Sequence, residues 1–258
     1  MSVFANYAEI YDTLNAGKDY AKEAEFVAQL LREVAPGART LVNFGCGTGQ
    51  HDLLLAKSGF ETLGVELSAH MLEQAKARGA KADILEGNAR FTQGDFRNFD
   101  AGRSFDAVVS LFHVMSYQTS DADVAAAFAT LNAHMSTGSV ALFDLWHGPA
   151  VEHVLPETRV RRAENDNLKI LRIAEPQHDG GARVVTVKFT FFVEDKNTGA
   201  ISSFEELHPM RYFFPAEIEK HIEAAGLKLR ETGEWLTRNA PSQDTWSVYY
   251  LVEKTGHR

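Results

Sequence analysis

The segment that most constrains the fold of this 258-residue chain is Leu41-Val42-Asn43-Phe44-Gly45-Cys46-Gly47-Thr48-Gly49-Gln50. An apolar run with a strand-like bias leads into three glycines spaced two apart, and a helix-compatible segment, residues 51–57, follows. A strand, a tight loop and a helix N-terminus in this order predict the ligand-binding edge of an open, doubly wound α/β sheet. Gly47 and Gly49 lack a Cβ atom, so a ligand can lie directly against the backbone there.

The loop differs from two common phosphate-binding motifs. A dinucleotide fingerprint has glycine at the sixth place of G-x-G-x-x-G, where this chain has Gln50. A P-loop requires Gly-Lys-Ser/Thr, and the first lysine after the glycines is Lys57. The loop therefore favours a nucleoside ligand that has no pyrophosphate to anchor, and it argues against a short-chain dehydrogenase.

Two carboxylates follow at informative positions. Residues 61–66 predict a second strand ending at Glu66, 21 positions after Gly45. This is close to the spacing at which an acid accepts hydrogen bonds from ribose hydroxyls. A third strand, residues 91–96, is predicted to end in a Gly-Asp turn, where Asp95 could accept a bond from an exocyclic adenine amine. The alternatives are a charged strand end for Glu66 and an ordinary turn for Asp95.

Four motifs in order resemble those of class I S-adenosylmethionine-dependent methyltransferases. They are Gly45-Cys46-Gly47-Thr48-Gly49, Gly64-Val65-Glu66-Leu67-Ser68, Gly94-Asp95-Phe96 and Phe105-Asp106-Ala107-Val108. The resemblance covers residues 41–146, with a family-like tail from Met210. It implies a Rossmann-like, mostly parallel seven-stranded sheet in which the last two strands form a hairpin. It also implies S-adenosyl-L-methionine as cofactor and S-adenosyl-L-homocysteine as product.

The resemblance implies a set of cofactor-binding residues. These are Tyr11, Tyr20, Asn43, Gly45, Cys46, Gly47, Thr48, Gly49, Glu66, Leu67, Met71, Gly94, Asp95, Phe96 and Leu111. Asn43 is a departure, since the family usually has an acid two places before the first glycine. An uncharged amide there predicts weaker attraction for the ammonium group of the methionine moiety. Cys46 is interpreted as a small spacer in the loop, although a thiol near a helix N-terminus could also be a nucleophile.

The organisation of the chain follows from its periodicity and turn residues. Helices are predicted over 5–14, 20–34, 69–78 and 121–135 and from Pro215, and core strands over 40–44, 61–66, 91–96, 105–112, 139–146, 227–236 and 245–252. Four further strands, at 158–162, 168–174, 183–193 and 200–213, predict an antiparallel insert after the fifth strand. We therefore expect N-terminal lid helices (1–36), a cofactor-binding core (37–150), an acceptor-binding β insert (151–214) and a C-terminal helix and strands that complete the sheet (215–258).

The acceptor side offers two candidate bases. Open α/β sheets bind ligands outside the carboxyl ends of their strands, and His113 follows the apolar fourth strand at that end. A histidine there is a reasonable general base for an amine that must lose a proton, and a neutral, packed histidine is the alternative. Tyr117, four residues on, is the second candidate.

Further residues are candidates for binding the acceptor. Asp144, Trp146 and His147 close the fifth strand and are expected to face the same edge, with structural packing as the alternative. Arg159 and Arg161 share one face of a regular strand, where two guanidinium groups could hold a phosphate or carboxylate. A solvated strand face is the alternative for these arginines and for Arg211.

A closer resemblance narrows the acceptor. The stretches Tyr7-Ala8-Glu9-Ile10-Tyr11-Asp12 and Gly17-Lys18-Asp19-Tyr20, with the insert, resemble N-methyltransferases of nucleotide-linked deoxyaminosugars. The resemblance implies that tyrosines 7, 11 and 20 line the cleft and that arginines of the insert face a pyrophosphate. It places a histidine base nearer the position of Tyr117 than of His113, which leaves the base open. A small-metabolite O- or C-methyltransferase and a non-catalytic nucleoside-binding module are the alternatives.

Composition restricts the partners. A net charge of -9 argues against a general nucleic-acid surface, which needs clustered Lys and Arg. The single cysteine, Cys46, excludes an intrachain disulfide, and no metal-ligand spacing such as H-E-x-x-H is found. No apolar run of membrane-spanning length or signal-peptide core is present, so a cytoplasmic protein with no membrane partner is expected. A homodimer is one option for its assembly.

Overall fold

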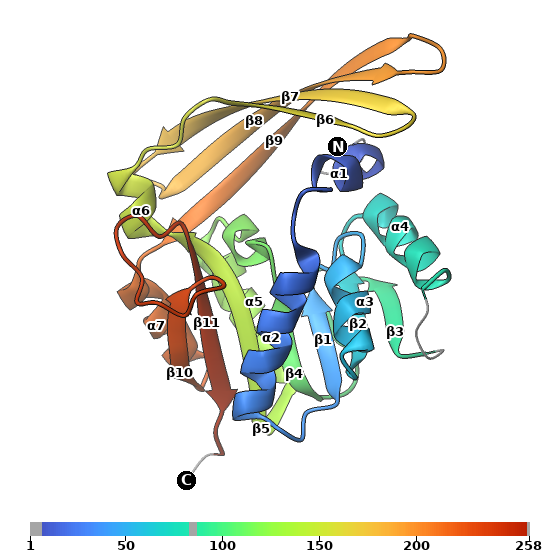
Figure 1. Ribbon diagram of the computed structural model, residues 1–258. Coiled ribbons are helices and arrows are strands. Elements are labelled where there is room, and N and C mark those ends of the chain that lie inside the picture. The colour runs from blue at the N-terminus through green and yellow to red at the C-terminus, as the bar shows by residue number, and fades with distance from the viewer. Residues whose placement is uncertain (1–6, 83–86, 257–258) are drawn as a thin grey trace.

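The computed structural model describes residues 7–82 and 87–256. The centre of this part of the chain is a seven-stranded sheet in the order β3-β2-β1-β4-β5-β11-β10 (Figure 1). Strands β1 to β5 run parallel, whereas β11 runs antiparallel to both β5 and β10. The strands are β1 (Thr40–Phe44), β2 (Glu61–Glu66), β3 (Ala89–Gln93), β4 (Phe105–Ser110), β5 (Met135–His147), β10 (Leu227–Glu234) and β11 (Ser247–Lys254). The predicted Rossmann-like sheet is confirmed.

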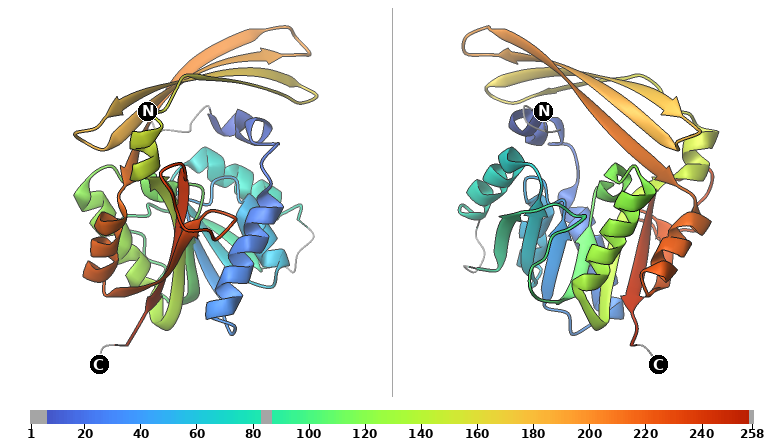
Figure 2. Two further views of the ribbon diagram at one scale, coloured as in Figure 1. Left: turned by 60° about the vertical axis from the view of Figure 1, so that its left-hand side comes forward. Right: turned by 180° about the vertical axis from the view of Figure 1, so that it is seen from behind.

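Helices cover both faces of this sheet (Figures 1 and 2). On one face, α2 (Tyr20–Val34) and α3 (Gln50–Lys57) bury Val27, Leu31 and Leu55 against β1, β4 and β5. On the other face, α5 (Asp121–Ala133) and α7 (Pro215–Ala224) bury Phe128 and Ile218. Helix α4 (Ala69–Gly79) packs beside β2 and β3. Burying apolar side chains on both faces is what holds a mostly parallel sheet together.

Local sequence signals fix where three of these helices begin. Asp19, Ser68 and Ser120 are the N-caps of α2, α4 and α5, and each side chain accepts a hydrogen bond from a backbone amide of the first turn. These bonds satisfy amides that have no partner within the helix. Pro215 begins α7, where a missing N–H costs nothing.

The antiparallel insert forms a second layer over the carboxyl ends of the core strands (Figure 1). Its strands β6 (Arg159–Glu164), β7 (Leu168–Asp179), β8 (Val184–Asp195) and β9 (Ile201–Phe213) pair in sequence order. A short parallel pairing of β9 with β5, at Trp146–Tyr212 and His147–Phe213, joins the insert to the core sheet. The insert is therefore rooted on the strand that ends at the predicted site.

Only one of the two helices expected to form a lid lies in a lid position. Helix α2 packs on the central sheet, whereas α1 (Tyr7–Leu14) lies between the insert and α4 (Figures 1 and 2). Ile10 and Leu14 of α1 pack with Met71 of α4 and with Ile170 and Phe191 of the insert. This cluster ties the three layers together above the cofactor edge.

The structure differs from the sequence predictions at several boundaries. Strand β5 begins at Met135, not 139, because it pairs with Phe105 at the start of β4. Strands β7 and β8 extend beyond their apolar stretches because they pair with each other over their full length. A 3-10 helix, η1 (Val114–Tyr117), and a short helix, α6 (Gly148–His153), were not expected. No helix in the described part of the chain is both long and apolar enough to cross a lipid bilayer.

Candidate active site

The glycine loop connects β1 to α3 at the carboxyl edge of the sheet. Its three glycines adopt positive φ angles of 78°, 57° and 76° at positions 45, 47 and 49. A Cβ atom on Gly45 would lie 2.5 Å from Val114 Cγ2, and one on Gly49 would lie 2.7 Å from the Phe91 ring. At Gly47, by contrast, a Cβ atom would meet no atom within 4 Å. The loop is therefore packed from behind at two glycines and open on the side of Gly47.

Glu66 faces this loop from the end of β2. Its Oε2 accepts a hydrogen bond from the amide of Gly47 at 2.9 Å, and its Oε1 accepts one from the amide of Ser68 at 2.8 Å. The residue is 8% exposed, and burial raises the pKa of its carboxyl, although these amide bonds oppose the shift. The carboxylate is thus held beside the open side of the loop, where the sequence places the ribose.

Asn43 does not point at the open edge. It is buried within β1, and its Nδ2 donates to Asp52 Oδ2 at 2.8 Å. Burial raises the pKa of Asp52 to about 7 even though the bond from Asn43 lowers it. The Asn43 amide is therefore paired with a buried acid in this structure, and its contact with the cofactor stays a prediction.

Cys46 is a spacer in this structure. Its side chain is buried, and desolvation together with the nearby Asp52 and Glu66 raises the pKa of the thiol. A thiolate nucleophile would need the opposite shift. The interpretation of Cys46 as a small residue in the loop agrees with these surroundings.

An anchor for α1 on the glycine loop was not anticipated from the sequence. Asp12 accepts hydrogen bonds from Thr48 Oγ1 at 2.9 Å and from Gln50 Nε2 at 3.0 Å, and it is ion-paired with Arg78 of α4. Arg78 Nε also donates to the carbonyl of Thr48. The Thr48 side chain thus anchors α1 to the loop, and only the meeting of three distant segments reveals this contact.

The segment between α1 and α2 reaches the end of β4. Lys18 is ion-paired with Glu23, and its Nζ lies 4.0 Å from the centre of the Phe112 ring. His51 Nε2 lies 2.8 Å from Glu23 Oε2. Burial alone would raise the pKa of Glu23, but hydrogen bonds from His51 and Lys18 lower it to about 2.

Three residues implied to bind the cofactor have side chains in the protein interior instead. Phe96 stacks on Phe44 with ring centres 4.7 Å apart, Leu111 is buried against α2, and Met71 belongs to the cluster between α1 and the insert. Their sequence neighbours are at the edge, but these side chains turn inward because the surrounding surface is apolar. The contacts of these three residues with the cofactor stay predictions.

The remaining implied cofactor residues stay near the edge. Leu67 is 59% exposed beside Glu66, which leaves an apolar surface that a flat base can cover. Asp95 is bound by Arg97, whose hydrogen bonds lower the pKa of the Asp95 carboxyl. Gly94, just before it, has no room for a Cβ atom, which would lie 2.4 Å from Phe99.

The N-terminal tyrosines differ in their surroundings. Tyr20 is buried and packs edge-on to His51, with ring centres 4.9 Å apart, and Tyr11 packs against the cluster between α1 and the insert. The side chain of Tyr7 is outside the described residues. Tyr11 therefore supports the position of α1, whereas Tyr20 packs α2 against α3.

His113 and Asp144 form a pair at the ends of β4 and β5. His113 Nδ1 lies 2.8 Å from Asp144 Oδ2, and the His113 amide donates to both carboxylate oxygens at 3.2 Å. Phe112 and His113 adopt positive φ angles of 67° and 64°, which non-glycine residues rarely do. The backbone is thus held in a strained turn that presents the imidazole, 21% exposed, at the sheet edge.

Tyr117 belongs to a second chain of polar groups. Its hydroxyl lies 2.8 Å from His208 Nδ1, and His208 Nε2 lies 3.1 Å from Glu206 Oε2. Tyr117 ends η1, whereas His208 and Glu206 lie on β9 of the insert. Sequence reasoning missed His208 and Glu206, because nothing in the sequence brings β9 to the end of β4.

Two residues predicted to bind the acceptor have other partners in this structure. His147 does not share the edge with Asp144: strand alternation turns it to the other side, where its Nδ1 bonds the carbonyl of Thr245 and burial lowers its pKa. Arg211 is 9% exposed and is ion-paired with Asp121 and Glu217, so it clamps β9 to α5 and α7. Trp146, by contrast, lies beside His113, with ring centres 6.3 Å apart.

Arginines line the inner face of the insert near its edge strand. Arg161 of β6 is directly opposite Arg172 of β7, and Arg159 is opposite Ala174, so all three alternate onto one face. That face also carries Ile170 and Phe191, which pack onto α1. Like charges directly opposite each other are unfavourable unless an anion compensates them.

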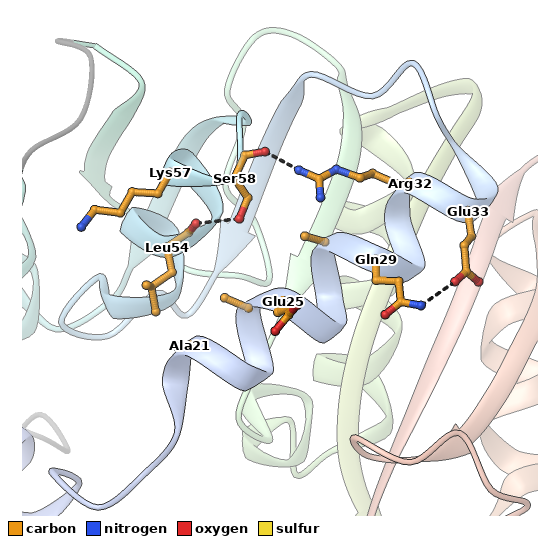
Figure 3. Close-up of a pocket in the computed structure, with 10 residues that line it drawn as sticks. Ala21, Glu25, Gln29, Arg32, Glu33, Leu54, Lys57 and Ser58 are labelled. Carbon is orange, nitrogen blue, oxygen red and sulfur yellow. Dashed lines mark hydrogen bonds between the residues drawn. The ribbon is translucent and has the colours of Figure 1, made fainter.

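Two other features are separate from this edge. In a groove of about 670 Å³ between α2 and α3, two lining side chains are already paired: Arg32 bonds the Ser58 carbonyl and Gln29 bonds Glu33 (Figure 3). Among the described residues, Asp121, Glu217 and His221 bring metal-ligating atoms together, but Arg211 is bonded to both carboxylates. Neither feature includes a residue of the cofactor edge.

A short-chain dehydrogenase is also excluded by geometry. The spacing Tyr-x-x-x-Lys does occur at Tyr250 and Lys254, but both lie in strand β11 and not on one face of a helix. Tyr250 is buried in the core, and Lys254 donates to the carbonyls of Asn132 and Met135. The pair therefore cannot serve a hydride-transfer site.

The strand order, the glycine loop and Glu66 define a class I S-adenosylmethionine-dependent methyltransferase. Comparison with known families agrees, since the model of a methyltransferase domain matches residues 41–138. A dTDP-3-amino-3,4,6-trideoxy-alpha-D-glucopyranose N,N-dimethyltransferase from Streptomyces venezuelae is 34% identical, over 87% of this chain and 91% of that protein. The chain therefore belongs to the S-adenosylmethionine-dependent methyltransferases.

Two further relatives support this assignment. A dTDP-3-amino-3,6-dideoxy-alpha-D-glucopyranose N,N-dimethyltransferase from Streptomyces fradiae is 31% identical, over 86% of this chain and 84% of that protein. The structure of CalS10, an amino pentose methyltransferase from Micromonospora echinaspora solved with S-adenosylmethionine bound, superposes with a TM-score of 0.76. It is 27% identical and covers 99% of both chains.

Proposed function

We propose that this enzyme N-methylates the amine of a nucleotide-linked aminosugar, with S-adenosylmethionine as the methyl donor. The observation that carries the proposal is the insert, whose inner face covers the cofactor edge with both cationic and proton-accepting side chains. Relatives at 31–34% identity are named as dTDP-aminosugar N,N-dimethyltransferases, which supports the same substrate class here.

The cofactor edge fits an adenosine-bearing ligand. The carboxylate of Glu66 would accept hydrogen bonds from the ribose hydroxyls, and the exposed Leu67 would cover one side of the base. The open face at Gly47 leaves space against the backbone, and Asp95 would accept a bond from the adenine amine. Bound there, S-adenosylmethionine supplies a methyl group already activated by its sulfonium.

The protein contributes mainly positioning and proton removal. An amine lone pair must lie in line with the bond from the methyl group to sulfur, and holding two reactants in this geometry lowers the barrier substantially. An acceptor amine is protonated near neutral pH, so a base must take a proton before the lone pair is free. His113 beside Asp144 and Tyr117 beside His208 are the two candidates at the sheet edge.

The arginines of the insert would hold the nucleotide part of the acceptor. Arg159 and Arg161 of β6 share a face with Arg172, and guanidinium groups bind phosphate oxygens with paired hydrogen bonds. Asp144 and Trp146, at the end of β5, would border the sugar. The covering insert and α1 would exclude water from the reacting atoms.

The test is a methylation assay with three acceptors: a dTDP-linked aminosugar, the same aminosugar without its nucleotide, and a dTDP-linked sugar with hydroxyls only. We expect a mass gain of one methyl group on nitrogen for the first acceptor alone. Methylation of the free sugar, or of oxygen in the third acceptor, would instead support a small-metabolite methyltransferase. Cofactor binding without turnover of any acceptor would leave a nucleoside-binding module.

A further inference from the structure

We propose that Tyr117, His208 and Glu206 form a proton relay that removes the ammonium proton of the acceptor. In this relay Tyr117 contacts the substrate, and His208 and Glu206 act through it as positioning and proton-storing residues. The inference rests on the proposed N-methylation, because the proton that the relay removes is that of the acceptor ammonium. It assigns the base, which neither the sequence nor the relatives decide.

The geometry sets the direction of the relay. As a carboxylate, Glu206 only accepts hydrogen bonds, so the proton of the neutral His208 ring resides on Nε2, 3.1 Å from Glu206 Oε2. Nδ1 is then an acceptor, and the Tyr117 hydroxyl, 2.8 Å away, donates to it. Each group is thereby ready to pass a proton inward from the phenol.

The two inner groups of the relay are more buried than its tyrosine. Tyr117 is half-buried at the end of η1, whereas the side chains of His208 and Glu206 are only 2% and 10% exposed. The Phe189 ring packs edge-on against His208, with ring centres 4.8 Å apart. Water therefore reaches the tyrosine end before it reaches the imidazole, as expected of a path that takes protons from a bound acceptor.

The proton balance is complete without a further reactant. The substrate ammonium gives its proton to the Tyr117 oxygen as the Tyr117 hydroxyl proton moves to His208 Nδ1, and the resulting imidazolium is paired with Glu206. The freed lone pair then forms the nitrogen–carbon bond while the methyl–sulfur bond breaks and its electrons remain on sulfur. His208 returns the proton to solvent after product release.

The charged groups on this face favour an anionic substrate. Arg172 of β7 and Arg161 of β6 share the inner face of the insert with Glu206 and His208. Arg172 lies over the Phe189 ring, 4.9 Å from its centre, and the same ring packs against His208.

The experiment measures kcat against pH for wild type, H208Q, E206Q and Y117F, with a dTDP-linked aminosugar. At pH 7 we expect kcat of H208Q and Y117F to fall about 100-fold, with KM for S-adenosylmethionine unchanged. The deficit should shrink about tenfold per pH unit as the acceptor amine loses its own proton in solution. H178Q is the matched control, because His178 pairs with Tyr212 on the same sheet, 2.9 Å away, outside the site.

Each outcome decides between the roles. A loss in H208Q that is the same at every pH would make the pair structural and overturn the relay, as would a pH-dependent loss in H113Q instead. If H208Q fails to fold, E206Q and Y117F carry the same test. If wild type binds S-adenosylmethionine but methylates no aminosugar, the proposed function fails and the relay with it. If the wild type is active and the pH profiles of kcat in all variants run parallel to its own, the relay is refuted and the proposed function stands.

Discussion

The cofactor edge and the acceptor side of this enzyme are built in different ways. The cofactor edge uses backbone amides and glycines from two neighbouring strands, and Glu66 and Gly47, which bond each other, are 19 positions apart. The acceptor side uses side chains from η1, β5 and β9, and the Tyr117–His208 bond spans 91 positions. A site built from the backbone of neighbouring residues is constrained by its own sequence motif. A site built from side chains far apart in the sequence depends instead on how the layers of the fold are stacked.

The two sides also differ in how well they tolerate substitutions. At the cofactor edge, Gly45 and Gly49 have no free space, and Glu66 is held by two amides. On the acceptor side, the insert meets the core through two paired residues of β5 and β9, the α1 cluster, the Arg211 ion pairs and the Tyr117–His208 bond. We infer that substitutions at the edge affect the cofactor and the fold, while substitutions of insert residues outside these contacts affect the acceptor alone.

The largest expected effect concerns the buried acid behind the cofactor edge. The pKa of Asp52 is raised from 3.8 to about 7, so the native state holds a proton that the unfolded state releases near pH 4. The preferential protonation of Asp52 in the native state stabilises the fold relative to its ionised form. This stabilisation is complete below pH 4 and is lost as pH rises towards 7, by about 4 kcal/mol in total. D52N should then be more stable than wild type at pH 8 and no more stable at pH 4.

Denaturant unfolding at the two pH values measures this difference. D106N is a control of opposite sign. Three hydrogen bonds from Arg39 and Thr40 outweigh burial and lower the pKa of Asp106. Removing the Asp106 carboxylate should therefore destabilise the protein at pH 8. An equal change for D52N at both pH values would show that Asp52 titrates normally.

The next effect is on cofactor affinity through Glu66. E66Q replaces a carboxylate that would bind both ribose hydroxyls, and we expect S-adenosyl-L-homocysteine to bind about 100-fold more weakly in calorimetry. The matched control is E61Q at the other end of β2, where Glu61 contacts Arg90 and Arg103 on the surface. Unchanged affinity in E66Q would show that the Glu66 carboxylate does not bind the ribose hydroxyls.

A smaller effect tests the open side of the glycine loop. G47A adds a methyl group where the structure has free space and where we expect the cofactor to lie. It should therefore weaken cofactor binding about tenfold, beyond any effect of its lower folding stability. G102A is the control, because Gly102 also has a positive φ angle, 66°, and free space, but lies far from the edge in a surface loop. If both variants lose only stability, the cofactor does not pass over Gly47.

The smallest effect tests the acceptor side alone. R159A/R161A should raise KM for the nucleotide-linked acceptor about tenfold and leave cofactor affinity unchanged, because two phosphate contacts are lost. R162A on the outer face of the same strand is the control. A matching change in cofactor affinity would contradict the division of the molecule into two sides.

The backbone geometry of the proposed cofactor edge could be predicted from the sequence because it is local. Glycines that need positive φ angles, an acid at the end of the next strand and the N-cap serines leave direct marks in the sequence. Side-chain direction was less predictable. Met71, Phe96 and Leu111 lie beside the edge in sequence but pack inward, since the apolar surfaces they meet belong to other segments.

The sequence by itself determined the class of enzyme, the mostly parallel core sheet with its C-terminal hairpin, and the position of the glycine loop with Glu66. Only the tertiary structure decided that Asp12 anchors α1 to the loop, that Arg211 is a clamp, and that His208 and Glu206 stand behind Tyr117. The physical reason is that periodicity and turn residues act over a few positions, whereas these contacts form only when the insert folds back over the sheet.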